Sequence, residues 1–332
     1  MNLIFLGAAL LAGSLLAVQA SSNLQLTRAV GTPFGASTVQ LSVAAALLVV
    51  LAVATGAVGS IEYAWDVPVW QLLGGLASPI YITSGILLFP RLGALTAVAL
   101  FVTGQMLASL GLDLSGSLGV PQRSLTIGTV SGVVGVLAGI SVIIHGQRAA
   151  TGGPATEVVG QRAAGTTQTV TRSGIPTRLP LGLAGWILLG LFAGAALPVQ
   201  GAVNAQLRAS LQAPLAVALI SFVVATLAIA VALGVLLAAK ATPVPTLQPL
   251  ARMPWWGWLG AVCAAVYVTG TFMLIPEIGA ATTVALTITG QQLASAVIDG
   301  RGLFRMPQRT LAPSRLAGVV LLVAGSALIQ LA

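Results

Sequence analysis

The sequence predicts an all-α membrane protein in which ten transmembrane helices form two inverted five-helix repeats. Three observations lead to this prediction. Apolar residues make up 57% of the chain and charged residues only 6%, whereas about 25% of the residues of a soluble domain are charged. Apolar stretches of about twenty residues, enough to cross a hydrocarbon core about 30 Å thick, follow one another almost without a break. The third observation is that two blocks of sequence each occur twice.

Both repeated blocks keep a constant spacing between their copies. GSLLAVQASSNLQLTRAVGTPFGA (13–36) aligns with GAALPVQGAVNAQLRASLQAPLAV (194–217) at an offset of 181 residues. GALTAVALFVTGQMLASLGLD (93–113) aligns with GAATTVALTITGQQLASAVID (279–299) at an offset of 186, with 13 identities in 21 positions. Each half therefore encodes the same bundle, a pattern typical of membrane transporters.

Five apolar spans are expected in each half, each long enough, or nearly so, to cross the membrane. Most prolines, including Pro90 and Pro276, fall between these spans, where a missing N–H costs little, whereas Pro79 and Pro198 fall inside spans and predict kinks. The domains are the first repeat (1–145), a flexible linker rich in Gly, Thr and Arg (146–180), and the second repeat (181–332). The expected spans are Leu3–Leu26, Phe34–Val58, Val69–Phe89, Leu92–Leu112, Leu125–Ile144, Leu183–Leu207, Leu215–Ala239, Trp256–Ile275, Ile278–Ile298 and Leu316–Leu331.

The distribution of basic residues predicts the orientation. An odd number of spans per half inverts the second copy relative to the first. If the linker is cytoplasmic, twelve of the fourteen basic residues lie inside and only Arg123 and Arg208 lie outside, as the positive-inside rule requires. We therefore expect a multi-pass protein of the inner cell membrane, with both termini external and the linker cytoplasmic.

Side-chain amides within the spans are the candidate substrate-binding groups. Gln19 and Asn23 lie four residues apart and share a helix face, and so do Gln200 and Asn204. Lipid cannot satisfy their hydrogen bonds, so they should face the bundle interior. There they either contact a substrate in a central cavity or hold the two halves together, and both alternatives stay open. The residues expected on the cavity walls are Gln105, Gln291, Tyr81 and Tyr267.

Two carboxylates, Asp113 and Asp299, end the fourth span of each half. They are either structural acids at the membrane interface or groups that couple transport to protons. Thr283 and Thr287 replace Ala97 and Phe101 of the first half, which predicts a more polar wall in the second half. One histidine and one cysteine make a metal site improbable, and no cofactor is expected.

Several motifs carry a resemblance to a known family. The Q-x-x-x-N-x-Q-L elements (Gln19–Leu26 and Gln200–Leu207), the two T-G-Q-x-L-A-S runs and the two P-Q-R triplets resemble the YdcZ-like branch of the drug/metabolite transporter superfamily, in its fused two-repeat form. The resemblance implies a ten-span pseudo-dimer with a substrate cavity between its halves. The chain is also distantly similar to small multidrug resistance proteins, whose first span carries a glutamate that binds both proton and cation. Gln19 and Gln200 stand at the matching positions, and an amide does not titrate, so any proton coupling would have to involve Asp113 or Asp299.

These observations together predict a secondary transporter that moves a small, neutral or weakly polar solute of the drug/metabolite type by alternating access. The alternative is a non-transporting membrane scaffold or assembly partner, although such a protein could use purely apolar spans. An enzyme is not expected, because no catalytic constellation or nucleotide-binding loop is visible. The expected partners are a small-molecule substrate and the lipid bilayer. The scattered basic residues do not indicate nucleic acid, and the pseudo-dimer can be monomeric.

Overall fold

The computed structural model describes residues 3–120, 122, 124–151, 182–278, 280–309 and 311–331, and every element in these ranges is helical. The long helices of the first half are α1 (Leu3–Val30), α2 (Pro33–Ala54), α4 (Ala77–Leu92), α5 (Ala94–Ser115) and α6 (Ile127–Thr151). Those of the second half are α7 (Leu183–Leu211), α8 (Pro214–Ala238), α9 (Leu259–Ile278), α10 (Ala280–Arg301) and α11 (Pro313–Leu331). The short elements are η1 (Ala57–Trp65), α3 (Val69–Leu72), η2 (Leu73–Leu76), η3 (Ser117–Gly119), η4 (Gln248–Arg252), η5 (Trp255–Trp258) and η6 (Leu303–Arg305).

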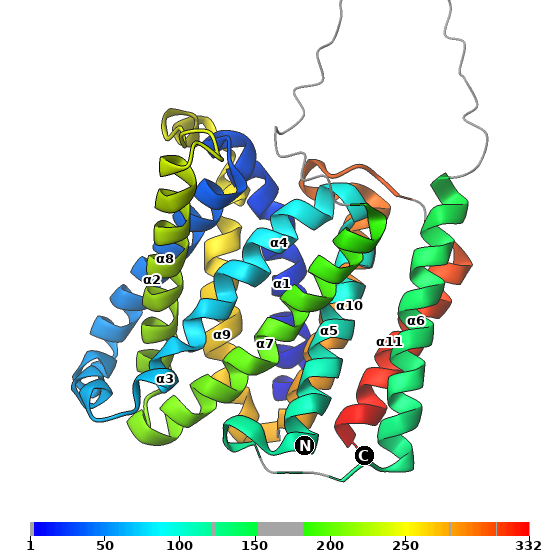
Figure 1. The fold of residues 1–332 in the computed structure, drawn as a ribbon, viewed down its shortest axis with the longest axis horizontal. Helices are drawn as coiled ribbons and strands as arrows, with labels where there is room; N and C mark the ends of the chain where they lie inside the picture. Colours follow the sequence, from blue (N-terminus) through cyan, green and yellow to red (C-terminus); the bar gives the residue numbers. More distant parts are fainter. Residues whose placement is uncertain are drawn as a thin grey trace, which may run out of the picture.

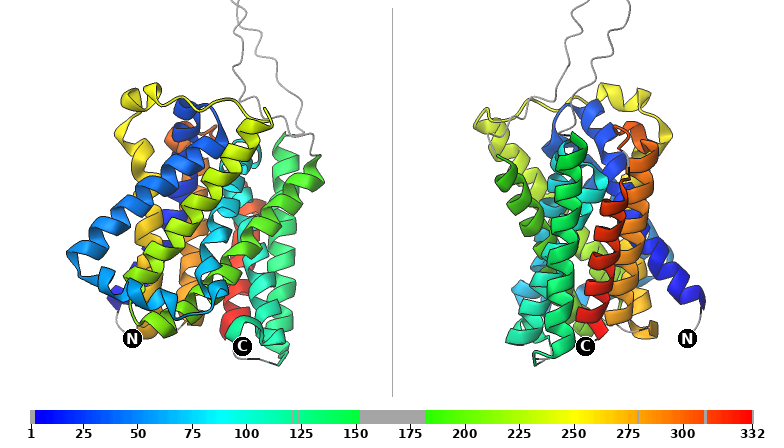
Figure 2. Two further views of the ribbon diagram at one scale, coloured as in Figure 1. Left: turned by 60° about the vertical axis from the view of Figure 1, so that its left-hand side comes forward. Right: turned by 90° about the vertical axis from the view of Figure 1, so that its right-hand side faces the viewer.

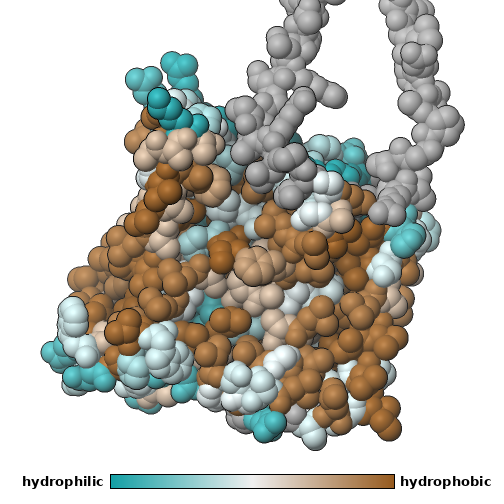
Figure 3. Space-filling view, in the orientation of Figure 1, coloured by the Kyte–Doolittle hydropathy of each residue, from teal (hydrophilic) through white to brown (hydrophobic). Residues whose placement is uncertain are grey.

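Seven of the described segments are long and apolar enough to cross a membrane, with α3, η2 and α4 counted as one segment from Val69 to Leu92. They coincide with the first seven predicted spans. α9, α10 and α11 coincide with the other three and fall outside these seven; α10 carries a stripe of Thr, Gln, Ser and Asp side chains. The face shown in Figure 3 is largely apolar between its two ends, as expected of a lipid-facing surface. The prediction of an all-α membrane protein is therefore confirmed.

The two ends of the bundle differ in what they carry. Figures 1 and 2 show both chain termini at one end, here called the terminal end, whereas α6 ends and α7 begins at the opposite end, here called the linker end. α1 runs from the terminal end to the linker end, and α7 runs the other way (Figure 1). The helix ends and loops of the linker end carry the basic residues Arg28, Arg91, Lys240, Arg252, Arg301, Arg305, Arg309 and Arg315.

Each half packs mainly against the other half. α1 lies against α9 and α10, and α7 lies against α4 and α5; α2 contacts α8, and α6 contacts α11. Glycines allow these close approaches. Gly13 of α1 lies against the backbone of Thr287, and Gly194 of α7 against the backbone of Phe101, which are equivalent positions of the two repeats. Small residues at helix crossings in lipid let backbones approach closely.

The structure corrects two local predictions. Pro90 and Pro276 lie inside α4 and α9, not between spans. Pro90 lacks the N–H that would donate to the Ile86 carbonyl, and the Arg91 guanidinium of the same turn donates to the Leu87 carbonyl (2.7 Å). α6 continues to Thr151, six residues into the predicted linker, whose remainder lies outside the described residues. The helix is 3₁₀ over Leu73–Leu76, just before Pro79, whereas α7 is helical through Pro198.

Candidate functional site

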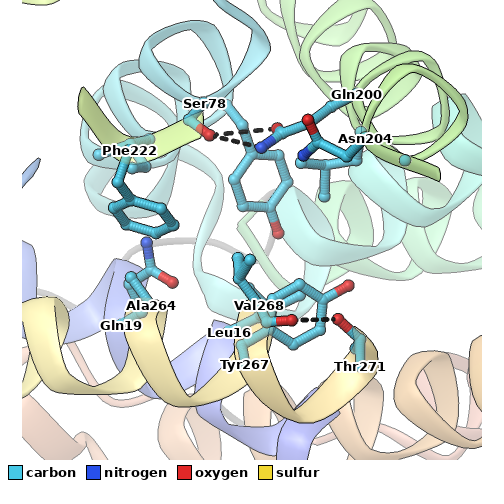
Figure 4. A pocket seen from close by; sticks show the side chains of 14 residues that line it. Leu16, Gln19, Ser78, Gln200, Asn204, Phe222, Ala264, Tyr267, Val268 and Thr271 are labelled. Carbon is cyan, nitrogen blue, oxygen red and sulfur yellow. Dashed lines mark hydrogen bonds between the residues drawn. The ribbon is translucent and has the colours of Figure 1, made fainter. Parts of the chain in front are cut away.

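A cavity of about 110 Å³, here called the inner chamber, lies in the middle of the bundle. Figure 4 shows Gln19 and Tyr267 of α1 and α9 on one side, facing Ser78, Gln200 and Asn204 of α4 and α7 on the other. Each side thus combines one helix from each repeat. The full lining is Leu16, Gln19, Ser78, Tyr81, Ile82, Leu197, Gln200, Gly201, Asn204, Phe222, Ala264, Tyr267, Val268 and Thr271.

Serine hydroxyls hold the amides of α7 in place. Gln200 Nε2 lies 2.9 Å from Ser78 Oγ and 3.3 Å from Ser221 Oγ, and Asn204 Nδ2 donates to Ser221 Oγ (3.2 Å). Asn204 Oδ1 has no hydrogen-bond partner among the described residues, and it packs against Gly74 of η2. The α7 amides are therefore oriented, with one acceptor unused.

The α1 amides behave differently from each other. Gln19 lines the inner chamber, and its Oε1 has no partner within the described part of the chain. Asn23, one turn further on, is not among the lining residues; its Nδ2 donates to Gln40 Oε1 of α2 (2.7 Å). The expectation that all four amides face one cavity therefore holds for three of them. Asn23 is an interhelical contact in this structure because α2 offers it an amide partner.

Sequence reasoning missed the polar residues of the second span in each half. Gln40 and Ser221 stand at the same offset of 181 residues and receive the equivalent amides Asn23 and Asn204. A polar side chain at matched positions of two apolar spans was the signal that could have revealed them. Ser78, which contacts Gln200, carried no comparable signal.

The two tyrosines line the inner chamber as expected. The glutamines of the two fourth spans, Gln291 and Gln105, do not line it and lie in different places. Gln291 is fully buried behind Tyr81 and donates to its hydroxyl (2.7 Å), so it supports the chamber wall without lining it. Tyr81 also packs on Phe101, with ring centroids 4.7 Å apart. Gln105 lies instead in a second cavity.

This second cavity, here called the vestibule, has a volume of about 580 Å³ and is formed by α5, α7, α9 and α10. Leu197, Gly201, Tyr267 and Thr271 line both this cavity and the inner chamber, so the two spaces are neighbours. Its polar lining includes Gln105, Ser109, Asp113, Arg208, Gln212, Thr283 and Thr287. Thr283 and Thr287 line the vestibule from α10 of the second half, and Gln105, Ser109 and Asp113 line it from α5 of the first half.

The two carboxylates occupy different environments. Asp113 is half-buried and lines the vestibule. Asp299 is fully buried and accepts hydrogen bonds from the backbone N–H groups of Ala94 (2.7 Å) and Leu95 (3.0 Å) and from Arg315 Nη2 (3.4 Å). Asp299 is thus buried against the start of α5 and is not exposed at the interface. Among the described residues, no three His, Cys, Asp or Glu side chains are grouped to hold a metal ion.

Comparisons with known proteins agree with this arrangement. The family described as "Putative inner membrane exporter, YdcZ" matches residues 4–142 and 185–328, one match for each repeat. Several chains of known structure also match. One, titled "Crystal structure of protein", is 19% identical, covers 98% of this chain and 94% of its own, and has a TM-score of 0.52. That likeness concerns the fold alone, and no curated protein matches. The two family matches show that the chain belongs to the YdcZ exporter family, in its fused two-repeat form, and is a multi-pass transporter of the inner membrane.

Proposed function

We propose that the protein moves a small solute by alternating access, through the inner chamber and the vestibule between two inverted repeats. One observation carries the proposal: Gln19 and Gln200, and Tyr81 and Tyr267, come from matching positions of the two repeats and meet on the walls of one chamber. A scaffold has no need of such a chamber, and the matching family is one of exporters, not of enzymes.

The opposite directions of α1 and α7 support the inverted relationship (Figure 1). The contacts between the two repeats support it too. α1 packs on α9 and α10 of the second repeat, and α7 packs on the equivalent helices α4 and α5 of the first. Two repeats related by an axis in the membrane plane form two alternative gates around one site, which is the basis of alternating access.

The basic residues at the linker end support a cytoplasmic position for that end. The vestibule reaches residues of the terminal end, such as Gln212 after the last turn of α7 and Val120 after η3. We therefore assign this structure to the outward-open state, with the solute path closed toward the cytoplasm. Asp113 is the carboxylate on this path, which makes it the better placed of the two for any proton coupling.

The chemistry of the inner chamber supports an uncharged solute with hydrogen-bond donors. Within the part of the chain that the structure describes, its lining contains no Asp, Glu, Lys, Arg or His, so a bare organic cation would lose its hydration without a counter-charge. Among the described residues, the carbonyl oxygen of Gln19 has no hydrogen-bond partner. Tyr81, Tyr267 and Phe222 add aromatic surface for a planar group.

A screen for ligand-induced thermal stabilisation of the purified full-length protein tests the proposal. The screen compares neutral metabolites with organic cations. We expect a neutral solute with hydrogen-bond donors to stabilise the wild type and Gln206→Leu, but not Gln200→Leu. Gln206 is the matched control because it lies on the same helix and bonds the Gly119 carbonyl outside the chamber. Equal stabilisation of Gln200→Leu and the wild type would show that the solute does not bind in the inner chamber.

A further inference from the structure

The linker end of the bundle carries far more positive than negative charge. The chain has only six acidic residues. Four of them belong to segments at the terminal end: Glu62, Asp66, Asp113 and Glu277. Asp299 is buried against the start of α5, so Glu157 of the linker is the one other acid that could reach the linker end. The excess of Arg and Lys at this end therefore remains, whatever the linker contacts.

Two arginines and a tryptophan of this end form a cluster, here called the Arg–Trp cluster (Arg28, Trp256 and Arg305). Arg28, in the last turn of α1, donates from Nη2 to the Arg305 carbonyl (3.5 Å). The Arg305 guanidinium lies 5.8 Å from the centroid of the Trp256 ring, within the range of a cation–π interaction. Both arginines are exposed. The contact between α1 and η6 thus brings two positively charged residues together at the surface.

Arg305 stands where the backbone favours glycine. Its φ is +56°, in the left-handed region, which is unfavourable for any residue with a Cβ atom. The equivalent residue of the first repeat is Gly119, with a φ of +73°, and the residues before them, Leu118 and Phe304, agree in φ at 54° and 56°. The same local structure therefore forms with glycine, and an arginine at this position costs backbone stability.

The terminal end has the matching arrangement without the charges. Beside Gly119, at the offset of 181 residues, Ala209 corresponds to Arg28. At the offset of 186 residues, Trp70 corresponds to Trp256. The packing is the same at both ends, since α3 and η3 contact α7 just as η5 and η6 contact α1. The fold therefore keeps the tryptophan and needs neither arginine, which points to a role of the two arginines outside folding.

The surroundings of the cluster indicate the boundary between lipid and water. Trp255, beside Trp256 in η5, is exposed, and tryptophans favour this boundary. α10, which leads into η6, exposes Leu293, Val297 and Arg301 at four-residue spacing, and so on one helix face. An apolar stripe that ends in arginine suits a molecule with an acyl chain and an anionic head.

We propose that the Arg–Trp cluster binds the phosphate of an anionic phospholipid, whose acyl chains lie along the exposed apolar face of α10. Arginine suits phosphate because its planar guanidinium donates two parallel hydrogen bonds. A lipid with net negative charge is preferred, because the ammonium group of a zwitterionic lipid would add positive charge to a site that already holds two arginines. The bound lipid joins α1 of the first repeat to η6 of the second. This inference does not depend on transport.

A lipid titration of the purified full-length protein in a neutral detergent tests the site. The probe is dioleoylphosphatidylglycerol. Dioleoylphosphatidylcholine controls for the acyl chains, and inorganic phosphate controls for a free anion. The measurement is the melting temperature as a function of ligand concentration. Phosphatidylglycerol should raise the melting temperature of the wild type saturably, because a ligand that binds only the folded state stabilises it, and neither control should do so.

Three variants separate the cluster from the rest of the basic surface. Arg28→Ala and Arg305→Gly introduce the residues of the other repeat, and each should raise the half-saturating concentration of phosphatidylglycerol about fivefold. Lys240→Gly is the matched control. Lys240, in the α8–η4 connection, is also basic, exposed and left-handed, with a φ of 53°, but it lies outside the cluster. This variant should keep the half-saturating concentration of the wild type.

Arg305→Gly should also melt no lower than the wild type when no lipid is added, since glycine suits the left-handed backbone. A lower melting temperature would show that the arginine serves the fold, against the proposal. Equal losses of lipid response in Lys240→Gly and Arg305→Gly would show attraction by the whole basic surface and overturn the site. The proposal would also fail if phosphatidylglycerol did not stabilise the wild type, if either control stabilised it equally, or if both arginine variants responded like the wild type.

Discussion

At the scale of the residue, one wall of the inner chamber depends on a buried pair of polar side chains. Gln291 reaches Tyr81 from behind the wall (2.7 Å), and both side chains are buried. Because hydrocarbon supplies no replacement partner, each of these groups relies on the other to satisfy its hydrogen-bonding capacity. The orientation of the Tyr81 ring, and with it the shape of the chamber, therefore depends on Gln291.

Tyr81→Phe should lower the stability of the purified protein by about 1–3 kcal/mol, because it leaves the buried Gln291 amide without its acceptor. The double variant Tyr81→Phe/Gln291→Leu should recover much of the loss, since it removes both polar partners together. Thermal unfolding of the single and double variants measures the effect. A double variant less stable than Tyr81→Phe would show that Gln291 has another, more important partner.

The candidate amides could be predicted from the sequence because each is duplicated at a constant offset in an apolar span. The hydrogen-bond partners of these amides could not be predicted. Asn23 shares a helix face with Gln19 and yet bonds Gln40, because the neighbour that a buried amide meets depends on how α1 packs on α2. Asp299 likewise meets the start of α5 only through the contact between the two repeats.

At the scale of the element, two asparagine–glycine contacts set how closely the helices approach. Asn23 Oδ1 packs against Gly260 of α9, and Asn204 Oδ1 packs against Gly74 of η2, at equivalent positions of the two repeats. A side chain on either glycine would occupy the space of the asparagine carbonyl oxygen. These contacts give the asparagines a packing role beside any role toward a solute.

Gly260→Ala should therefore destabilise the protein by about 1–3 kcal/mol through overpacking between α1 and α9. Gly270→Ala on the same helix is the matched control: a methyl group there meets nothing within 4 Å, and alanine favours the helix over glycine. Melting temperatures of the two variants, compared in one detergent, provide the measurement. Equal melting temperatures would mean that the Asn23 side chain moves away from the added methyl group without loss of stability.

The spans themselves followed from apolar length, which is a local property of the sequence. The exact ends of the helices did not, because a proline removes one backbone donor without necessarily ending a helix. Pro90 stays inside α4, where Arg91 supplies a donor to the Leu87 carbonyl. No local pattern in the sequence indicates the inner chamber or the vestibule, because helices from both repeats form them.

At the scale of the whole molecule, the doubled sequence and the exchanged contacts describe one unit built from two interlocked repeats. Neither repeat surrounds the chamber alone, because α1 and α4 need α7 and α9 to complete its walls. Basic residues gather at the linker end and the vestibule reaches the terminal end. The molecule is thus asymmetric across the membrane although its repeats are alike.

The orientation can be measured with single cysteines in a Cys263→Ala background. We expect an impermeant maleimide added to intact cells to label a cysteine at Ser117, in η3 at the terminal end, and not one at Thr242, in the α8–η4 connection at the linker end. The physical reason is the excess of Arg and Lys at the linker end. The reverse pattern would invert the assigned topology.

Transport itself tests the central claim, which is that a solute passes through the chamber that both repeats form. The measurement is uptake or efflux, in proteoliposomes, of a solute that stabilises the wild type, for Gln19→Leu, Gln200→Leu and the control Gln206→Leu. Both chamber variants should lose most transport while folding normally, because leucine suits a membrane interior, and the control should transport like the wild type. Wild-type rates in both chamber variants would contradict the account, since the paired amides would then serve only to hold the helices together.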